Sequence, residues 1–389
     1  MRFFHLSDLH IGKHLHLYSL AQDQAYILEQ IVEQAKVYRP DAIVIAGDIY
    51  DKSVPSAEAY QLFDRFLTAL SELEPMIPVF IIAGNHDSAE RLQFASSFLK
   101  KHDIYISVLP PQTKEEHLQK ISLQDEYGEV NFYLCPFLKP GYVRHLFEER
   151  EVTDYESAYT KILEREEIDT EKRNVLVAHQ FFVNQDTKPD TCDSEYSVSA
   201  IGGLDAIDIR VVSDFDYVAL GHIHGPQTFA GGRVRYCGTP LKYSVSEEHH
   251  KKSITMVSLK EKGELPEIET IPFKPLHDVK RIKGSLEELL SQKDSTSDYV
   301  SVTLTDEKEL YRPKDSLAEH YERILEVTVD NSRMRALQEK LEESYTWENK
   351  RTPLESFREF YQMMQGQPLS EKEEKEVTEI LAEMGEETV

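Results

Sequence analysis

Short apolar runs alternate with amphipathic stretches over roughly the first 270 residues, and this alternation restricts the chain to few folds. The runs are nearly continuous and rich in β-branched or aromatic residues, as in strands covered on both faces. They are Arg2–Leu6, Ala42–Ala46, Val79–Ala83, Asn174–Ala178 and Tyr217–Leu220. Ala21–Tyr38 and Ala57–Leu73 lie between the first three runs, and their apolar residues recur at helical spacing. Strand–helix–strand order predicts an α/β domain.

The later part of the chain changes character twice. From about Arg233 to Ile271, strand-like runs follow one another without helices, which predicts a largely antiparallel portion. Pro272 and Pro275 then mark a boundary, and the strand and helix patterns beyond it predict a small α+β capping domain. We therefore predict a main domain over residues 1–273, a capping domain over 274–346 and a helical partner-binding segment over 347–389.

The last segment carries two apolar stripes at helical spacing. They are Leu354, Phe357, Phe360, Tyr361 and Met364, and then Val377, Ile380, Leu381 and Met384. Pro353 precedes the first stripe at an N1-like position, and Ser370 with Glu373 forms a capping box before the second. Two short helices have little of their own chain to pack against, so we expect them to bind a partner. Packing on each other and on the capping domain is the alternative.

Charge and cysteine content exclude several classes of protein. The formal net charge is −26, so any polyanionic substrate must be attracted locally, by bound cations or by a partner. Cys135, Cys192 and Cys237 are far apart and form no CxxC pair, which favours reduced thiols in the cytosol. No run of about 18 apolar residues could span a bilayer, and no signal peptide is recognisable. We expect a cytoplasmic protein without a membrane anchor.

Five polar motifs stand at the C-terminal ends of predicted strands, where open α/β sheets bind ligands. They are Asp8-Leu9-His10, Gly47-Asp48, Gly84-Asn85-His86-Asp87, His179 and Gly221-His222-Ile223-His224. Residues two apart in an extended segment point to the same side, which pairs Asp8 with His10 and His222 with His224. The glycines leave room for tight turns and for close approach to an ion. Each motif alone could simply satisfy loop backbone, but the five together predict a metal site.

The types of ligand favour two metal ions. Carboxylate, imidazole and amide groups suit manganese, iron or zinc, whereas the motifs contain no thiolate. Seven candidate ligands exceed what one ion binds, so two ions that share a bridging carboxylate are the economical interpretation. Asp8 and Asp48 neutralise only part of the charge of two divalent cations. The remainder favours a bridging hydroxide and a phosphate diester, as two-metal hydrolysis requires.

The order of the motifs resembles that of the calcineurin-like metallophosphoesterases. Within this family the chain resembles the SbcD group of nuclease subunits most closely. The stretches that carry this resemblance are Phe4–Gly12, Ala46–Asp51, Ala83–Asp87, Leu220–His224 and Tyr236–Lys242. The resemblance spans nearly the whole chain. It implies a four-layer α/β sandwich, with two facing β-sheets flanked by helices, followed by a small α+β capping domain and C-terminal helices.

The resemblance also implies roles for the site residues, with manganese as the expected metal. One ion is held by Asp8, His10, Asp48 and His224, and the other by Asp48, Asn85, His179 and His222. His86 faces the scissile phosphate, stabilises developing charge and protonates the leaving 3′ oxygen. In the related protein phosphatases an aspartate at the position of Asp51 partners the catalytic histidine, which assigns Asp51 to orienting and charging His86. An aspartate that merely caps the following turn is the alternative.

The function implied is that of a metal-dependent DNA nuclease subunit in DNA repair, recombination and replication. It would be a double-strand exonuclease and a single-strand endonuclease that processes DNA ends and hairpins by hydroxide attack. An SbcC-type coiled-coil ATPase would be its partner, with two nuclease and two ATPase subunits; this chain has no phosphate-binding G-x-x-x-x-G-K-[ST] loop. The first alternative is a binuclear phosphatase or small-molecule phosphodiesterase, which would not need the cap and terminal helices. The second is an inactive scaffold, which would not need His86.

Two weaker features lie outside the motifs. Lys242 and Tyr243 follow Gly238-Thr239-Pro240 and are candidates for lining a DNA groove. The charged stretch Glu247–Lys252, which contains two adjacent histidines, is expected to be a solvated loop and not a ligand pair.

Overall fold

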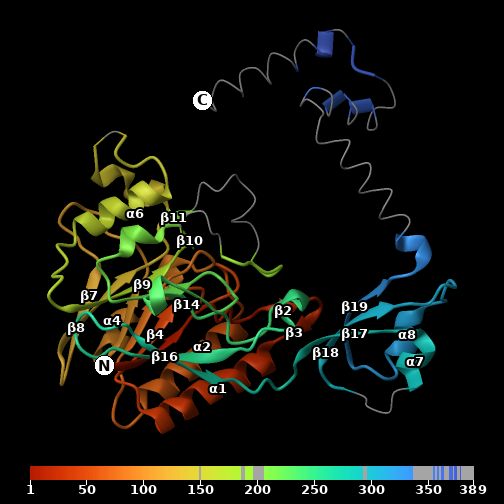
Figure 1. Cartoon of the computed structure of the whole chain (residues 1–389), viewed down its shortest axis with the longest axis horizontal. Helices are drawn as coiled ribbons and strands as arrows, with labels where there is room; N and C mark the ends of the chain where they lie inside the picture. Colours follow the sequence, from red (N-terminus) through yellow and green to blue (C-terminus); the bar gives the residue numbers. More distant parts are fainter. Residues whose placement is uncertain are drawn as a thin grey trace. The chain divides into compact units, whose positions relative to one another are not determined.

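The computed structural model describes most of the chain, in two compact units. The residues described are 1–148, 150–184, 189–195, 206–291, 296–335 and isolated positions between 354 and 377. The first unit contains Met1–Ile282 and the first parts of two later strands, and the second begins at Lys283 (Figure 1). The first unit thus extends past residue 273, and the predicted three-part division stays a prediction. Among the described helices, none is long and apolar enough to cross a membrane.

Two six-stranded mixed sheets form the first unit. The first has the order β16-β15-β1-β4-β5-β6 and the second the order β13-β14-β12-β9-β8-β7. The strands of the first sheet are β1 (Arg2–Leu6), β4 (Ala42–Ala46), β5 (Val79–Ile82), β6 (Ile104–Ser107), β15 (Ser253–Ser258) and β16 (Glu267–Pro272). Those of the second are β7 (Gln119–Asp125), β8 (Gly128–Cys135), β9 (Arg173–His179), β12 (Tyr217–Gly221), β13 (Gln227–Phe229) and β14 (Val234–Tyr236).

Each sheet is parallel in its interior and antiparallel at its margins. β1, β4, β5 and β6 are parallel, whereas β15 and β16 run antiparallel to their neighbours. In the second sheet β8, β9, β12 and β14 are parallel, and β7 and β13 close the two edges antiparallel. The antiparallel portion predicted from Arg233 onward is therefore confirmed for β15 and β16. It is only half correct for β14, which pairs antiparallel with β13 and parallel with β12.

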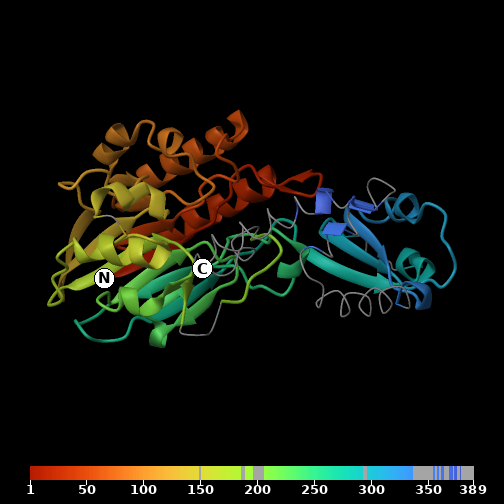
Figure 2. The same ribbon diagram turned by 90° about the horizontal axis from the view of Figure 1, so that it is seen from above.

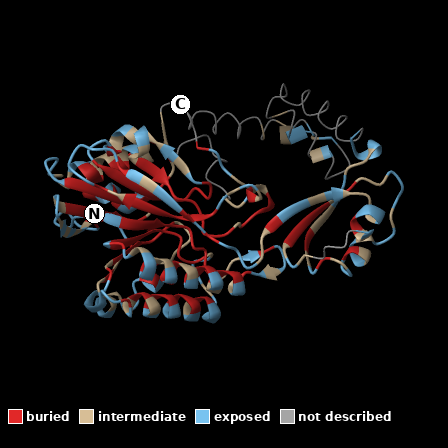
Figure 3. Cartoon of the chain, turned by 60° about the horizontal axis from the view of Figure 1, so that its bottom comes forward, coloured by how far each residue is buried: buried red, intermediate tan, exposed pale blue. Residues whose placement is uncertain are grey.

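The two sheets face each other and carry helices on their outer faces (Figures 1 and 2). α1 (Ala21–Tyr38) and α2 (Ala57–Ser71) pack on the first sheet, and α5 (Pro140–Val143) and α6 (Tyr155–Glu164) on the second. Strand residues alternate between faces, so Phe4 meets the helices while Phe3 meets the opposite sheet. The sheet interior is buried on both faces (Figure 3). The predicted four-layer α/β sandwich is confirmed.

Shorter elements connect and follow the sandwich. They are β2 (His14–Leu15), β3 (Tyr18–Ser19), α3 (Ala89–Leu92), α4 (Ser96–Leu99), β10 (Phe182–Val183) and β11 (Ile207–Asp208). Beyond them, a three-stranded sheet has the order β17 (Val279–Gly284), β18 (Tyr299–Leu304) and β19 (Arg323–Val329). The helices α7 (Leu286–Ser291) and α8 (Pro313–Leu317) accompany it, which gives the small α+β module expected there. Most of the two apolar stripes predicted after Pro353 lie outside the described residues.

Candidate metal centre

The five polar motifs meet at one edge of the sandwich, because each follows a strand that ends there. The loops after β1, β4 and β5 bring in Asp8 and His10, Asp48, and Asn85 from the first sheet. From the second sheet, β9 ends at His179 and β12 ends just before His222 and His224. The structure therefore brings all seven predicted ligands together.

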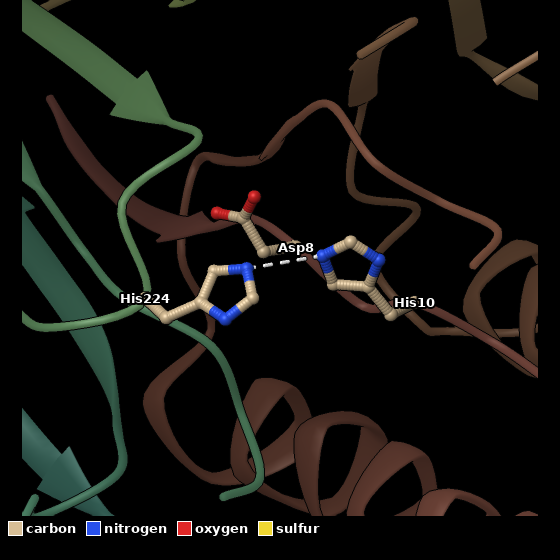
Figure 4. A group of neighbouring side chains, drawn as sticks. All are labelled: Asp8, His10 and His224. Carbon is tan, nitrogen blue, oxygen red and sulfur yellow. Dashed lines mark hydrogen bonds between the residues drawn. The ribbon is translucent and has the colours of Figure 1, made fainter. Parts of the chain in front are cut away.

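Asp8, His10 and His224 form one half of the cluster (Figure 4). Nε2 of His10 lies 3.2 Å from Nε2 of His224, and their potential ligand atoms lie within 4.8 Å of an oxygen of Asp8. Nε2 of His10 also lies 3.6 Å from Oδ2 of Asp48. All three side chains are buried, so the donor atoms converge in a space from which solvent is largely excluded.

The second half of the cluster is built around Asn85. Its Oδ1 lies 3.1 Å from Nε2 of His179 and 3.0 Å from Nδ1 of His222. Nε2 of His179 also lies 3.4 Å from Oδ2 of Asp48. Oδ2 of Asp48 therefore faces a histidine of each half, the position that a bridging carboxylate requires.

The hydrogen bonds around the histidines fix which nitrogen can bind a cation. Nδ1 of His179 donates to the carbonyl of Ala46 at 2.8 Å, so Nε2 is the ring nitrogen that faces Asp48 and Asn85 and that could bind a cation after losing its proton. Nδ1 of His224 lies 2.7 Å from Oγ of Ser194, and its Nε2 faces Nε2 of His10. The imidazole nitrogens and the carboxylate oxygens of the cluster face one another, an arrangement that bound cations would stabilise. The donor set fits two divalent cations.

Burial and charge set the ionisation of the cluster. Burial lowers the pKa of His222 and of His224 to about 3, and that of His10 well below its ordinary value, so all three imidazoles are neutral and able to bind metal. Burial also opposes charge on His179, but the carboxylates of Asp48 and Asp8 outweigh it and raise the pKa of His179 to about 9. A cation entering this half must therefore displace a proton from His179.

The backbone is strained at four ligand positions. Asp8, His10, Asp48 and His222 have φ angles of 54°, 43°, 50° and 97°, in the region that favours glycine. Such conformations cost on the order of 1–3 kcal/mol each and persist where the surrounding structure enforces them, typically at active sites. The strain marks this edge of the sandwich as a functional site independently of the residue types.

The motif glycines are required by close packing between neighbouring loops. A Cβ atom on Gly84 would lie 2.1 Å from Oδ1 of Asp48, and one on Gly221 would lie 2.0 Å from the carbonyl of Ala46. We expected these glycines to allow close approach to an ion. The structure shows that they admit a neighbouring ligand side chain or strand backbone instead.

His86 lies beside the cluster with its ring held by main-chain atoms. Its backbone N–H donates to Oδ1 of Asp48 at 2.9 Å, and its Nδ1 lies 2.8 Å from the carbonyl oxygen of Asp51. Nε2 lies 3.9 Å from Oδ2 of Asp48, and the side chain is 35% exposed. His86 also lines a small cleft of about 30 Å³ with Asp48, Asn85 and the two histidines that follow β12.

The contact expected between the Asp51 carboxylate and His86 is made differently. The main-chain oxygen of Asp51 orients the ring, while the carboxylate accepts a hydrogen bond from Nζ of Lys13 at 2.7 Å. The lysine is part-buried beside Asp51 and satisfies the carboxylate locally. The structure thus supports an orienting position for Asp51, but through its backbone and not through its charge.

Family comparisons agree with this geometry. The calcineurin-like phosphoesterase profile matches residues 1–226, and the Type 5 capsule protein repressor C-terminal domain matches residues 275–365. The D subunit of the nuclease SbcCD from Staphylococcus epidermidis (strain ATCC 12228 / FDA PCI 1200) is 32% identical over 330 residues, which cover 84% of each protein. This chain belongs to the SbcD group of calcineurin-like phosphoesterases. It is therefore a metal-dependent phosphodiesterase with a binuclear metal site.

Solved structures resemble this SbcD-type chain more distantly. The protein TT1561 of Thermus thermophilus is 12% identical, with a TM-score of 0.40, and the match covers 69% of this chain and 98% of that one. A dimetal phosphatase from Danio rerio is 14% identical, with a TM-score of 0.38, and the match covers 70% and 99%.

Asp87 has a part in the SbcD-type site that its sequence position alone did not assign. Its carboxylate accepts hydrogen bonds from the backbone N–H groups of Ile49 at 3.1 Å, Tyr50 at 2.9 Å and Gly84 at 2.9 Å. These bonds tie the loop after β4 to the loop after β5, and so hold Asp48 against Asn85. The signal was present in the sequence, because Asp87 completes the Gly-Asn-His-Asp motif.

A second unassigned feature is a buried relay behind His224. Oγ of Ser194, which faces Nδ1 of His224, donates to Oε1 of Glu247 at 2.6 Å. Glu247 is fully buried and forms an ion pair with Nζ of Lys252 at 2.5 Å. Burial opposes the charge on Glu247, but Lys252 and His224 lower its pKa to about 2, so the carboxylate is ionised. The expectation of a solvated loop at Glu247–Lys252 is wrong for these two residues.

Lys242 and Tyr243 do not have the groove-lining positions considered for them. Nζ of Lys242 donates to the carbonyl of Glu248 at 2.6 Å and pairs with Oδ1 of Asp278 at 2.8 Å. Tyr243 is buried, and the centroid of its ring lies 5.6 Å from that of His10. Tyr243 therefore packs behind the SbcD-type site, and Lys242 is engaged by Glu248 and Asp278.

Proposed function

We propose that this chain is the nuclease subunit of an SbcCD-type complex. It would hydrolyse phosphodiesters at DNA ends and hairpins and within single strands, in DNA repair, recombination and replication. One observation carries the proposal: seven metal-binding side chains converge in two halves that share Asp48, with His86 beside them on the cleft. The SbcCD nuclease relative supports a nucleic acid as the substrate.

The two halves of the cluster correspond to two cations, for which we propose manganese. We assign one cation to Asp8, His10, Asp48 and His224, and the other to Asp48, Asn85, His179 and His222. When bound, such cations polarise the phosphate and lower the pKa of a water molecule, so that it can attack near neutral pH.

His86 supplies the proton for the leaving group in this proposal. The carbonyl of Asp51 holds Nδ1–H of its ring, which leaves Nε2 on the side of Asp48 and the cleft. In the protonated ring, Nε2–H can donate to the phosphate oxygens as charge develops and then to the leaving 3′ oxygen. This role does not require the Asp51 carboxylate to stabilise a charged His86. The backbone oxygen of Asp51 can accept from Nδ1–H whether the ring is neutral or protonated.

The SbcD-type family implies an SbcC-type coiled-coil ATPase as partner, and we place its docking surface on the C-terminal stripes. We retain the proposed division into a nuclease domain over 1–273, a capping domain over 274–346 and a helical partner-binding segment over 347–389. Truncation after Trp347 is expected to leave manganese-dependent cleavage of short single strands intact and to abolish co-purification with the ATPase. A truncated protein that co-purifies at full yield would place the docking surface elsewhere.

We further propose that two copies of the chain associate through an aromatic face near α2. Phe94 is 83% exposed and Phe98 is 61% exposed, and both line a cavity of about 380 Å³ with Tyr60 and Phe63. Exposed aromatic side chains gathered on one face are typical of protein interfaces. The double substitution Phe94→Ser with Phe98→Ser should convert a dimer into a monomer in sedimentation experiments. Leu17→Ser, at a side chain that is 90% exposed, is the matched control.

Digestion of linear and hairpin DNA tests the proposed function. Manganese should be required, and the ATPase partner with ATP should stimulate cleavage of hairpins. Bis(p-nitrophenyl) phosphate is assayed in parallel; hydrolysis of this ester without cleavage of any DNA would favour the small-molecule phosphodiesterase. Asp48→Ala should abolish both activities, because both halves of the cluster lose a ligand. Near wild-type activity of this variant at saturating manganese would show that the two-cation assignment is wrong.

A further inference from the structure

A strip of aromatic and cationic side chains begins at the metal centre with a half-buried ring and continues to exposed side chains. It consists of Phe137 and Lys139, which lie between the end of β8 and the start of α5, and of Tyr142 within α5. Nζ of Lys139 lies 5.7 Å from the centroid of the Phe137 ring and 5.9 Å from that of the Tyr142 ring. Lys139 is exposed, and Tyr142 is 38% exposed. One ammonium group therefore lies between two rings that solvent can reach.

The strip begins at the half of the metal centre that contains Asn85. The Phe137 ring lies nearly parallel to that of His222, at 24° and 6.4 Å between centroids, and 6.3 Å from the ring of His179. The backbone N–H of Phe137 donates to the carbonyl of Ala83 at 2.9 Å, directly before the Gly-Asn-His-Asp motif. A strand whose phosphate lies at the metal centre would have its adjacent nucleoside within reach of this strip.

Buried hydrogen bonds fix the backbone under the strip. The side-chain amide of Gln180, which is 1% exposed, accepts from the N–H of Leu138 and donates to its carbonyl, both at 3.2 Å. Leu138 itself is fully buried. The residues on either side of Leu138 are therefore anchored to the end of β9, next to His179. A rigid support of this kind preorganises the strip for binding.

This combination of groups matches the chemistry of single-stranded nucleic acid. Aromatic rings stack on bases of any sequence, and a neighbouring cation pairs with the phosphate backbone. Within the described part of the chain, no carboxylate forms an ion pair with Lys139, although the whole chain carries a formal charge of −26. An ammonium that has no carboxylate partner, and that lies over the ring packed on His179 and His222, is thus a local attraction for a polyanion on an acidic protein.

We propose that Phe137, Lys139 and Tyr142 form a subsite for a nucleoside of single-stranded DNA next to the phosphate that is cleaved. The base stacks on the aromatic rings and takes the place of the Lys139 ammonium, which moves to the neighbouring backbone phosphate. This inference rests on the proposed nuclease function and adds substrate-binding residues to it. Any base can occupy the subsite, because stacking does not depend on a specific pattern of hydrogen bonds.

The test combines protein variants with oligonucleotides in which one base at a time is removed. For the wild type, kcat/KM relative to that for bis(p-nitrophenyl) phosphate should fall about tenfold when the missing base is the one that stacks, within the range expected for one stacked base. Tyr142→Leu should lower this ratio about tenfold for the intact strand and should be insensitive to removal of that base. Phe137 is left unchanged in this test, because its ring packs against His179 and His222.

Lys139→Ala tests the cationic part separately. The slope of log affinity against log salt concentration should become shallower by about 0.7, the value for one phosphate contact on a single strand. Matched controls exist elsewhere in the chain. Tyr127→Leu replaces a tyrosine that is 42% exposed beneath Arg173, and Lys120→Ala removes an exposed lysine 6.0 Å from the Tyr133 ring. Neither control should change the oligonucleotide-to-ester ratio.

The outcomes separate the subsite from the nuclease function. If the wild type hydrolyses the ester but no oligonucleotide, both the proposed function and the subsite are overturned. If it cleaves oligonucleotides while Tyr142→Leu keeps the wild-type ratio and the same sensitivity to missing bases, the subsite alone is overturned. A salt slope unchanged by Lys139→Ala would remove the lysine from the subsite.

Discussion

At the scale of single residues, the position of His86 allows a test of the proposed proton transfer separately from metal binding. Its ring is held by the carbonyl of Asp51, while Nε2 stays 3.9 Å from the nearest oxygen of Asp48. His86→Gln should therefore retain metal and DNA affinity but lose rate by roughly 10²–10⁴-fold, as for the loss of a general acid. Single-turnover cleavage at saturating manganese measures the rate, and elemental analysis measures the metal content.

The competing role for His86 is that of a metal ligand, since it lies in a group with His10 and Asp48 that could hold a cation. A His86→Gln protein that purifies with only one of its two metals would establish that role. A comparison with Asp51→Asn is informative, because this substitution leaves the orienting backbone carbonyl in place. We expect Asp51→Asn to cost far less rate than His86→Gln.

A second prediction concerns the relay behind His224. Ser194→Ala removes the hydroxyl between Nδ1 of His224 and the ionised Glu247, so the imidazole loses the partner that orients it. Loss of such an outer partner typically weakens metal affinity or activity 10- to 100-fold. Titration calorimetry with manganese should show weaker binding at one site, with activity largely recovered at saturating metal. Ser194→Thr keeps the hydroxyl and should restore the affinity.

A purely structural role for Ser194 would give a different pattern. The melting temperature of Ser194→Ala would fall while its manganese affinity stayed at the wild-type value. That result would show that Ser194 and Glu247 stabilise the fold behind the end of β12 and do not affect metal binding.

At the scale of secondary-structure elements, a buried histidine joins the two sheets. Nδ1 of His5, on β1, lies 2.8 Å from the hydroxyl of Tyr217, and its Nε2 lies 3.2 Å from the carbonyl of Leu220, both on β12. Burial, with a contribution from Arg235, lowers the pKa of His5 to about 3. The ring is therefore neutral in the folded protein at any pH near neutrality.

This neutral histidine makes the stability of the sandwich depend on pH. The unfolded chain protonates His5 near its ordinary pKa of about 6.5, so between this value and about 3 the unfolded state binds more protons. Stability is thus full above about pH 6.5 and falls as the pH decreases. From pH 7 to pH 5 the loss is about 2 kcal/mol for one such group. Urea unfolding of the wild type and of His5→Gln should show a shallower pH dependence in the variant; equal slopes would contradict the prediction.

The elements also show which contacts a sequence can reveal. The ends of parallel strands must meet at one edge, so the amino-acid pattern alone could place the polar motifs after β1, β4, β5, β9 and β12 together. The relay between Ser194 and Glu247 could not be placed in this way, because it joins a loop and a single 3-10 turn that are 53 residues apart and have no periodicity. Spacing also predicted a contact between Asp51 and His86, but not that the backbone carbonyl makes it while the carboxylate pairs with Lys13.

Strand direction marks a similar limit. The runs after Arg233 have no helices between them, and this pattern alone favours antiparallel neighbours. β14 nevertheless pairs parallel with β12, because the short antiparallel strand β13 lies between them in the sequence and reverses the chain. A three-residue strand of this kind leaves little trace in the amino-acid pattern.

At the scale of the whole molecule, the metal centre connects the two sheets of the sandwich, because both sheets contribute ligands. Asp8, Asp48 and Asn85 come from the first sheet, whereas His179 and His222 come from the second. Saturation with manganese should therefore stabilise the folded state, by about 2.7 kcal/mol at a concentration 100 times the dissociation constant. Thermal unfolding with manganese and with EDTA measures the shift. Asp48→Ala should lose most of it, and a wild type with equal melting temperatures in both conditions would contradict the assignment.

The same division of ligands between sheets has a consequence for how the enzyme is made. On a ribosome, residues emerge in order, and Asp8, Asp48 and Asn85 appear long before His222 and His224. β1 must also wait for β15, since the partner of Arg2 is Ser258. A nascent or truncated chain would have only part of the ligand set, and β1 would be paired with β4 on one edge alone. Nuclease activity should therefore arise only after translation has passed His224.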